Sequence, residues 1–483
     1  MLHPGLSVHN GLQGTSDHGA DPAEPTRRAP GDPLDRGTEK PQMHIRRLIH
    51  RTGLRERMPS FGQGSFALNT AFTSGKSVLT IVLQLLLTPV IVSLYEPSAY
   101  GAFSFIISVS TALLTICTLQ YDRALFLAQD EAEIGTLRMA SSLFPVAFSL
   151  LIALGLLFLR DPVLRSIDLE GMGNGIFMVP LLLALSGIAQ TSQRMVAVRY
   201  KYREGFLFGT LNVIGAKLFA IGHGLLVSGS FLGLALSEVI NKGLQWLLNE
   251  RVILKEAPAR VPRRGSLRQH LAVLRKYIAF PKYELPSTAI LALANQIPVF
   301  WLPRAFGITI LGQYALATSL MEMPMRLFGY SLAGTFYQKA ARTYREEGSR
   351  SLGRITRRMM AWIAVVCLPA LGLIAWQAEP VFALVFGEEW AMAGTFASRL
   401  AVAYYFRLVV EPVLSVLRVL GEQRRFLLFH SNFLFVRVMA VGLAVHLGSD
   451  PVAAITYYAL ANALGHLVVA VYLLLRLRHA GAR

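Results

Sequence analysis

The sequence predicts an all-α membrane protein, with twelve transmembrane helices in two six-helix lobes around a central cavity. Its composition is the first reason, because 53% of the 483 residues are hydrophobic, only 16% are charged, and the mean hydropathy is +0.46. Long apolar segments are the second reason, and the uneven distribution of basic residues between alternate loops is the third. These features favour a polytopic helical bundle over a soluble fold.

Twelve apolar segments follow one another along the chain, most of them long enough to cross the roughly 30 Å hydrocarbon core of a bilayer as a helix. They lie at residues 66–94, 100–121, 139–159, 176–197, 206–227, 231–250, 278–302, 308–334, 359–378, 391–417, 427–447 and 452–475. The seventh and eighth segments carry several prolines and charges. Such residues are tolerated at membrane depth where they face protein or water, so these two helices are expected to line a cavity.

The distribution of Lys and Arg predicts the orientation of the chain. Basic residues accumulate in the N-terminal tail and in every second loop, whereas the opposite loops contain only Arg160, Arg165 and Arg304. The positive-inside rule therefore predicts that both termini are cytoplasmic. Because the net charge of +18 sits largely in these loops, it indicates topology and not a nucleic-acid partner.

The same pattern predicts five regions. Residues 1–60 form a disordered cytoplasmic tail that lacks hydrophobic periodicity, and Met1, Met43 or Met58 is the true start. The N-lobe covers 61–250, a basic cytoplasmic linker 251–277, the C-lobe 278–476 and a short cytoplasmic tail 477–483. Six spans per half predict two parallel repeats. A weak sequence similarity between residues 101–108 and 312–319, offset by 211 residues, agrees with this prediction.

Polar stripes predict the lining of the cavity. Lys76 and Gln84 lie at helical spacing with one Asn and three Thr residues in the first span, and Asp122 ends a similar Ser and Thr stripe in the second. Helix packing is the alternative explanation for both stripes, since small polar residues are common at helix interfaces in membranes. For the second span the two explanations are equally good.

Seven basic residues lie well inside the spans, where each costs about 2.5–3.5 kcal/mol if it faces lipid. They are expected to point inward: Lys76, Lys217, Lys242, Arg326, Arg399, Arg407 and Arg437. Three have an acid one turn away, in the pairs Glu238 with Lys242, Glu322 with Arg326, and Glu411 with Arg407. These pairs either neutralise each other or contact a substrate. The other four bases have no acid one turn away. Their positive charge predicts a protein interior suited to an anion.

Signatures of enzymes and metal sites were not found, so no catalytic residue, metal or cofactor is predicted. Cys117 and Cys367 lie in apolar spans and are interpreted as core residues, not a disulfide. His223 and His466 are isolated, and a hydrogen-bonded packing role is favoured over proton relay.

Several short motifs resemble one membrane-protein family. They are Leu94–Gly101, Leu119–Ala124, Phe280–Tyr283, Asn295–Pro298, Leu311–Ala315, Pro324, and Phe386–Trp390 with Ala393 and Gly394. In this order they resemble the oligosaccharide-lipid flippases of polysaccharide biosynthesis, within the multidrug/oligosaccharidyl-lipid/polysaccharide exporter superfamily. The resemblance covers about Ser65 to Leu475. It implies a transporter in the bacterial inner membrane that moves undecaprenyl-diphosphate-linked oligosaccharides, in contact with membrane lipids and other polysaccharide assembly proteins.

The predicted sites follow from charge and from this implied anion. The predicted substrate-binding residues are Lys76, Lys217, Arg326, Arg399, Arg407 and Arg437. The predicted cavity-lining or ion-coupling residues are Gln84, Asp122, Glu238, Glu322 and Glu411. A drug or metabolite exporter of the same superfamily is the main alternative, but it should have a more acidic cavity. A membrane-embedded glycan polymerase is disfavoured by short outer loops, the longest running from Arg160 to Gly175.

Overall fold

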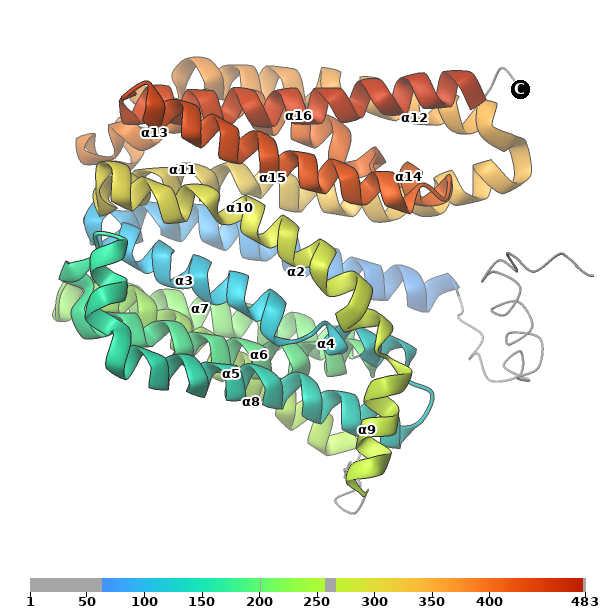
Figure 1. Cartoon of the computed structure of the whole chain (residues 1–483), viewed down its shortest axis with the longest axis horizontal. Coiled ribbons are helices and arrows are strands. Elements are labelled where there is room, and N and C mark those ends of the chain that lie inside the picture. Colours follow the sequence, from blue (N-terminus) through green and yellow to red (C-terminus); the bar gives the residue numbers. More distant parts are fainter. Residues whose placement is uncertain (1–62, 200, 257–265, 481–483) are drawn as a thin grey trace, which may run out of the picture. The chain divides into compact units, whose positions relative to one another are not determined.

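The computed structural model describes residues 63–199, 201–256 and 266–480, and every regular element within these ranges is a helix (Figure 1). The all-α prediction is therefore confirmed for the described part of the chain. The predicted disordered tail over residues 1–60 lies outside the described residues, as does part of the predicted linker. The side chain of Lys76 also lies outside them, although its backbone belongs to a helix.

The first half of the chain contributes six long helices, each built from one predicted apolar segment. They are α2 (Gln63–Val92), α3 (Pro97–Cys117), α5 (Glu131–Ser166), α6 (Met178–Val198), α7 (Tyr202–Leu226) and α8 (Phe231–Glu256). Helix α7 packs against α2 and α8, while α6 packs against α5 and α8. Helix α3 contacts α6 and α8 on one side and α10 and α11 of the second half on the other, so it joins the two halves.

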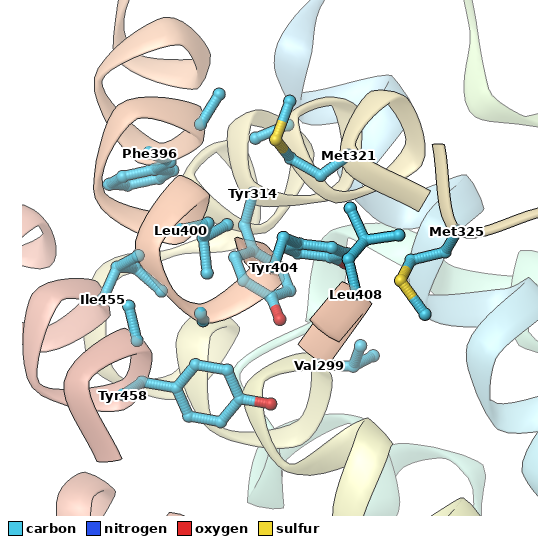
Figure 2. Packing of buried hydrophobic residues seen from close by; sticks show 14 of the residues in the cluster. Val299, Tyr314, Met321, Met325, Phe396, Leu400, Tyr404, Leu408, Ile455 and Tyr458 are labelled. Atoms are coloured by element: carbon cyan, nitrogen blue, oxygen red, sulfur yellow. The ribbon is translucent and has the colours of Figure 1, made fainter. Parts of the chain in front are cut away.

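The second half contributes six further long helices. They are α10 (Leu285–Phe306), α11 (Ile308–Pro324), α12 (Tyr330–Phe386), α13 (Ala391–Val410), α15 (Gln423–His446) and α16 (Pro451–Ala480). Helix α13 lies at the centre of this group, because it packs against α11, α12 and α16. Its buried side chains, including Phe396, Leu400 and Leu408, belong to a large apolar core (Figure 2).

Short elements connect or interrupt these helices. They are α4 (Tyr121–Ala124), η2 (Leu125–Leu127), η3 (Glu170–Phe177), α9 (Leu267–Lys276), η4 (Phe280–Glu284), η5 (Met325–Gly329), η6 (Glu388–Trp390), η7 (Glu411–Val413) and α14 (Val416–Val419). Two of them, η4 and η5, are π-helical turns in the stretch where the sequence places prolines and charges among apolar residues. Single π-turns widen a helix locally and are frequent at functional sites.

By length and composition, eight helices in the described ranges could cross a membrane, together with two shorter apolar ones, Val78–Val92 and Ser431–His446. All twelve predicted segments lie on helices, but the twelve segments and the eight candidate membrane-spanning helices do not correspond one to one, for physical reasons. Residues 308–386 run as one long helical stretch, broken in direction at Gly348, whose φ is 80°. Helix α8 is outside the set of eight, and it carries Glu238 and Lys242 near its middle. The number twelve stays a prediction.

Helices α3 and α11 cross at a pair of glycines so closely that no side chain fits between them. A Cβ atom on Gly101 would lie 2.1 Å from the carbonyl oxygen of Ile308, and one on Gly312 would lie 1.8 Å from that of Pro97. Both obstacles are backbone atoms, which cannot swing away. The two contacts are reciprocal, because Pro97 and Gly101 become Ile308 and Gly312 when 211 is added to each number.

The side chains around this crossing close the same end of the bundle. Trp390 is fully buried and meets the ring of Tyr100 edge to face, with 5.7 Å between the ring centroids. Gln313 donates a hydrogen bond of 2.6 Å to the carbonyl of Glu389 and accepts one of 2.9 Å from the amide of Ala393. These contacts hold the first turn of α13 beside the first turns of α3 and α11.

The predicted linker contains a helix that docks on the first half. Helix α9 begins with a capping box formed by Ser266 and Gln269. At its other end Lys276 pairs with Glu133 of α5, and the hydroxyl of Tyr277 donates a hydrogen bond of 2.8 Å to the same carboxylate. Burial and the adjacent Glu133 carboxylate raise the pKa of Tyr277. The linker is thus anchored before the chain enters α10.

Candidate functional site

The candidate site is a cavity of about 490 Å³ between α3 and five helices of the second half, namely α10, α11, α13, α15 and α16. Its lining combines aromatic and small side chains with several charged and amide groups. In size and in this mixture of apolar wall and few polar groups it is typical of small-molecule sites. Figure 2 shows Tyr404 of α13 and Tyr458 of α16, which both line the cavity and turn their hydroxyl groups toward the same region.

Arg437 is the most unusual residue of the cavity. It lies on α15, its exposed fraction is only 7%, and its polar partners are neutral amides. Its Nε donates to Oδ1 of Asn462 at 2.6 Å, and its Nη1 donates to Oδ1 of Asn295 at 2.7 Å. The rings of Phe433 and Tyr458 lie 6.0 Å from the guanidinium carbon. Within the described ranges no ion pair joins it to a carboxylate, so this buried positive charge is oriented but not neutralised.

A second charged group lies on the other side of the cavity. Arg407 of α13 forms an ion pair of 2.5 Å with Glu322 of α11, and the hydroxyl of Tyr404 donates to the same carboxylate oxygen at 3.2 Å. The guanidinium of Arg407 also stacks over the ring of Tyr404, 5.6 Å from its centroid. The ion pair joins α11 to α13, and the Glu322 carboxylate is engaged by both Arg407 and Tyr404.

Arg326 gives the cavity wall a third guanidinium. It lies in the π-helical turn η5 and is exposed, unlike Arg437. The three arginines and Glu322 therefore give the cavity lining a formal charge of +2, with His466 counted as neutral. In a partly dry cavity such charges act more strongly than in water, so the site favours an anion. A guanidinium also matches the geometry of phosphate oxygens.

The structure brings together four of the predicted site residues, Arg326, Arg407, Arg437 and Glu322. It also adds groups that the sequence reasoning did not select, namely Asn295 and a stripe on α16. Tyr458, Asn462 and His466 follow one another at steps of four residues, and all three are buried. The search for polar stripes could have found this one, because its spacing is that of the stripe in the first span.

His466 agrees with the favoured packing role. Its Nδ1 lies 2.8 Å from the carbonyl oxygen of Asn462, a geometry in which this nitrogen carries the proton and donates it. Its ring lies against Phe433, with 4.6 Å between the centroids. This contact orients the side chains of α16 that face Arg437.

Two of the three local ion pairs predicted from the sequence differ in their outcome. Lys242 and Glu238 form the predicted pair, with 3.1 Å between Nζ and Oε1. Glu322 instead binds Arg407 of another helix, not its neighbour Arg326. The reason is local geometry, since the chain enters the π-turn η5 between Glu322 and Arg326, and this turn alters the helical register.

The first half contains a separate charged cluster between α7 and α8, away from the cavity. Glu238 pairs with Lys242 and accepts a hydrogen bond of 3.1 Å from Asn241. Asn241 in turn accepts one of 3.0 Å from Asn212. The charge of Glu238 also acts on Lys217, which is partly buried. Lys217 and Glu238 were predicted to share a site with Arg437, but the structure places them elsewhere.

The remaining predicted site residues also lie outside the cavity lining. Asp122 is buried in α4, where it accepts a hydrogen bond of 2.9 Å from Gln190 and pairs with Arg194 at 3.4 Å. Arg399 is exposed on α13 and does not line this cavity. Its neighbours along α13 occupy the faces that pack on α11, α12 and α16. Gln84 and Glu411 are partly buried and do not line the cavity.

The pair of Glu322 and Arg407 gives a testable prediction. Arg407→Gln should lower the thermal stability of the detergent-solubilised protein, by about 1–3 kcal/mol, because it leaves a partly buried carboxylate without its charged partner. The double variant Glu322→Gln/Arg407→Gln should recover most of this loss. Thermal unfolding of both single variants and the double variant measures the coupling between the two side chains. Additive effects would contradict the interhelical pair.

The other reactive groups of the described ranges suggest no metal site. No cluster of three or more His, Cys, Asp or Glu residues with suitable spacing occurs there. Both cysteines are free thiols. Cys117 is buried, in agreement with the interpretation as a core residue, whereas Cys367 is only partly buried.

Comparison with known proteins identifies the family. A family model described as polysaccharide biosynthesis protein matches residues 75–394. The teichuronic acid biosynthesis protein TuaB of Bacillus subtilis is 25% identical over 276 residues, which are 57% of this chain and 56% of that protein. The succinoglycan biosynthesis transport protein ExoT of Rhizobium meliloti is 21% identical over 327 residues, 67% of this chain and 63% of that protein. Each match thus spans less than two thirds of the relative.

Solved structures show the same fold. An inward-facing multidrug resistance MATE transporter of the MOP superfamily matches with a TM-score of 0.64 and 16% identity, over 84% of this chain and 95% of that one. The lipid II flippase MurJ in an inward closed conformation matches with a TM-score of 0.58 and 10% identity, over 85% of this chain and 87% of that one. A MOP superfamily transporter from Pyrococcus furiosus matches with a TM-score of 0.59 and 15% identity, over 88% of this chain and 100% of that one. This multi-pass membrane protein therefore has the fold of the MOP superfamily and belongs to the polysaccharide biosynthesis protein family.

Proposed function

We propose that this protein is a flippase that moves undecaprenyl-diphosphate-linked oligosaccharides across the bacterial inner membrane. In this proposal twelve transmembrane helices form two lobes, and the cavity between α3 and the second half opens alternately to each side. Membership of a polysaccharide biosynthesis family and the shared fold with transporters support this assignment. The proposal includes no catalytic step, because the cargo crosses unchanged.

The observation that carries the proposal is the buried, un-neutralised guanidinium of Arg437. A diphosphate diester brings about two negative charges, and the cavity lining has a formal charge of +2. Asn295 and Asn462 hold the guanidinium by Nε and Nη1, so its other N–H groups remain available to a phosphate oxygen. Arg326 and the pair of Arg407 with Glu322 then supply the remaining field. Bidentate binding of phosphate by arginine gives strength and orientation.

A transport assay with two cargoes tests this proposal. The purified full-length protein, reconstituted in vesicles, should translocate an undecaprenyl-diphosphate disaccharide and should not translocate a cationic dye of the kind that multidrug exporters carry. The physical reason is the sign of the cavity charge, which repels a cation. Protein-free vesicles and vesicles containing Arg437→Gln serve as controls. Transport of the dye alone would favour the drug exporter.

The proposed orientation gives a separate prediction. Reporter fusions after Gly171, Glu388 and Ser449 should report the outer side of the membrane, and fusions after Arg203, Gly265 and Glu347 the cytoplasmic side. The basis is the charge bias between alternate loops. Each position is tested with two reporters, alkaline phosphatase and a fluorescent protein. A cytoplasmic position should give fluorescence and no phosphatase activity. An outer signal at Gly265 would contradict the division into six and six spans.

A further inference from the structure

An apolar groove of about 320 Å³ lies beside the cavity, on the other side of α11 and α13. Its floor consists of the buried side chains Ile363, Leu371 and Leu408, and its rim includes Trp362 and Val366, which are more than half exposed. No charged side chain contributes to its lining. Because its rim is open, a chain of carbon atoms can enter the groove from the bilayer.

Small residues keep this groove open. Gly329, Cys367 and Ala370 lie in its wall, where larger side chains would fill the space. A Cβ atom on Gly329 would already lie 3.0 Å from the terminal carbon of Met325 and 3.9 Å from Leu408. Figure 2 shows Leu408 beside Met325.

The groove and the cavity are neighbours in sequence as well as in space. On α13, Arg407 lines the cavity and the next residue, Leu408, lines the groove. Around the end of α11, Glu322 and Arg326 line the cavity, and Pro324 between them lines the groove. One wall thus presents cationic side chains on one side and purely apolar side chains on the other. A ligand that fits both must have an anionic head and a hydrocarbon tail.

We propose that the groove holds the polyisoprenoid tail of the same lipid whose diphosphate headgroup lies in the cavity. This inference rests on the proposed function and adds a subsite to it. The adjacency of the two sites selects this occupant over an ordinary phospholipid, because only a lipid whose headgroup enters the cavity uses both sides of the wall. Arg326, exposed at the π-turn η5, lies where head and tail diverge.

The natural cysteines provide a direct test. Cys367 lies in the groove and is partly accessible, whereas Cys117 is 2% exposed and should not react in the folded protein. An undecaprenyl-diphosphate disaccharide should slow the reaction of Cys367 with a maleimide by about tenfold or more. A farnesyl-diphosphate disaccharide, with the same headgroup and a short tail, should protect much less. Phosphatidylglycerol at the same concentration should not protect. Equal protection by phosphatidylglycerol would mean a general lipid site and would overturn the proposal.

Binding by variants gives a second, independent test. The unmodified protein should bind the undecaprenyl compound about tenfold more tightly than the farnesyl compound, since each buried methylene adds affinity. Cys367→Trp fills the groove and should abolish this preference while retaining affinity for the farnesyl compound. The matched control is Val365→Trp, which adds the same side chain two residues away at a position that is 71% exposed and outside the groove. It should retain the preference.

The outcomes separate this inference from the proposed function. Arg437→Gln should weaken binding of both compounds equally and keep the preference for the long tail, because it acts on the headgroup. If Cys367→Trp retains the full preference, the groove is not the tail site, although the flippase proposal stands. If neither compound binds the unmodified protein, both proposals fail. If Cys367→Trp does not fold, maleimide modification of the folded Cys117→Ala protein at Cys367 replaces it, with the same expected loss of preference.

Discussion

Replacing Arg437 by Gln is expected to reduce export of the surface glycan by on the order of 100-fold while the protein remains at its normal level in the membrane. Loss of a buried charge that binds a charged ligand typically costs 2–5 kcal/mol, and 1.4 kcal/mol corresponds to a factor of ten. Gln keeps an amide N–H group that can donate to Asn295 or Asn462, so the variant is expected to fold. Glycan at the cell surface and protein in the membrane are measured together.

Two further variants make this result specific. Arg437→Lys should keep partial activity, because lysine retains the charge but cannot bind two amides and a phosphate with one planar group. Arg399→Gln removes the same charge from an exposed position of the second half and should leave export intact. A drop in protein level for Arg437→Gln, with normal export per molecule, would assign Arg437 a structural role only.

Replacing Gly312 by Val is expected to lower transport by about 10- to 100-fold, because the first turns of α3 and α11 can no longer meet. Overpacking costs typically 1–3 kcal/mol, and here the obstacle is the carbonyl of Pro97, which is backbone. The conformation seen in the structure should therefore lose population. A cysteine introduced by Ser104→Cys in the cavity wall, with both native cysteines replaced, reports this change. In the proposed orientation this end of the bundle faces outward, so the cysteine should react faster with an impermeant thiol reagent added outside.

The matched control is Gly155→Val, since a Cβ atom at Gly155 of α5 meets nothing within 4 Å. This variant should transport normally and leave the reactivity of the cavity cysteine unchanged. Gly101→Val should behave like Gly312→Val, because its side chain would strike the carbonyl of Ile308. Normal transport by either crossing variant would mean that the close approach of α3 and α11 is not needed in the transport cycle.

The helices were predictable from the sequence because hydrocarbon-spanning segments need long apolar runs, and all twelve predicted segments lie on helices. The charged residues were predictable in kind but not in partner. Glu322 illustrates this, since helical spacing suggested Arg326 while the structure joins it to Arg407, 85 residues away. Spacing along one helix carries no information about which face of a second helix lies opposite.

The site was predictable in part for the same reason. Arg437 was selected because it lacks a local acid, and the structure gives it amide partners from α10 and α16. Lys217 satisfied the same criterion, yet it lies near Glu238 of the adjacent helix. The two positions differ only in what the neighbouring helix presents, and this became visible only when the helices were packed together.

The reciprocal crossing of α3 and α11 has a consequence for the history of the chain. In a symmetric dimer, each contact between one residue and another is repeated with the partners exchanged. Pro97 against Gly312 and Ile308 against Gly101 have this form, although both halves belong to one polypeptide. The crossing is therefore what two identical six-helix subunits, inserted with the same orientation, would make around a twofold axis. Gene duplication and fusion of such a subunit would keep this contact while freeing each copy to change its charges.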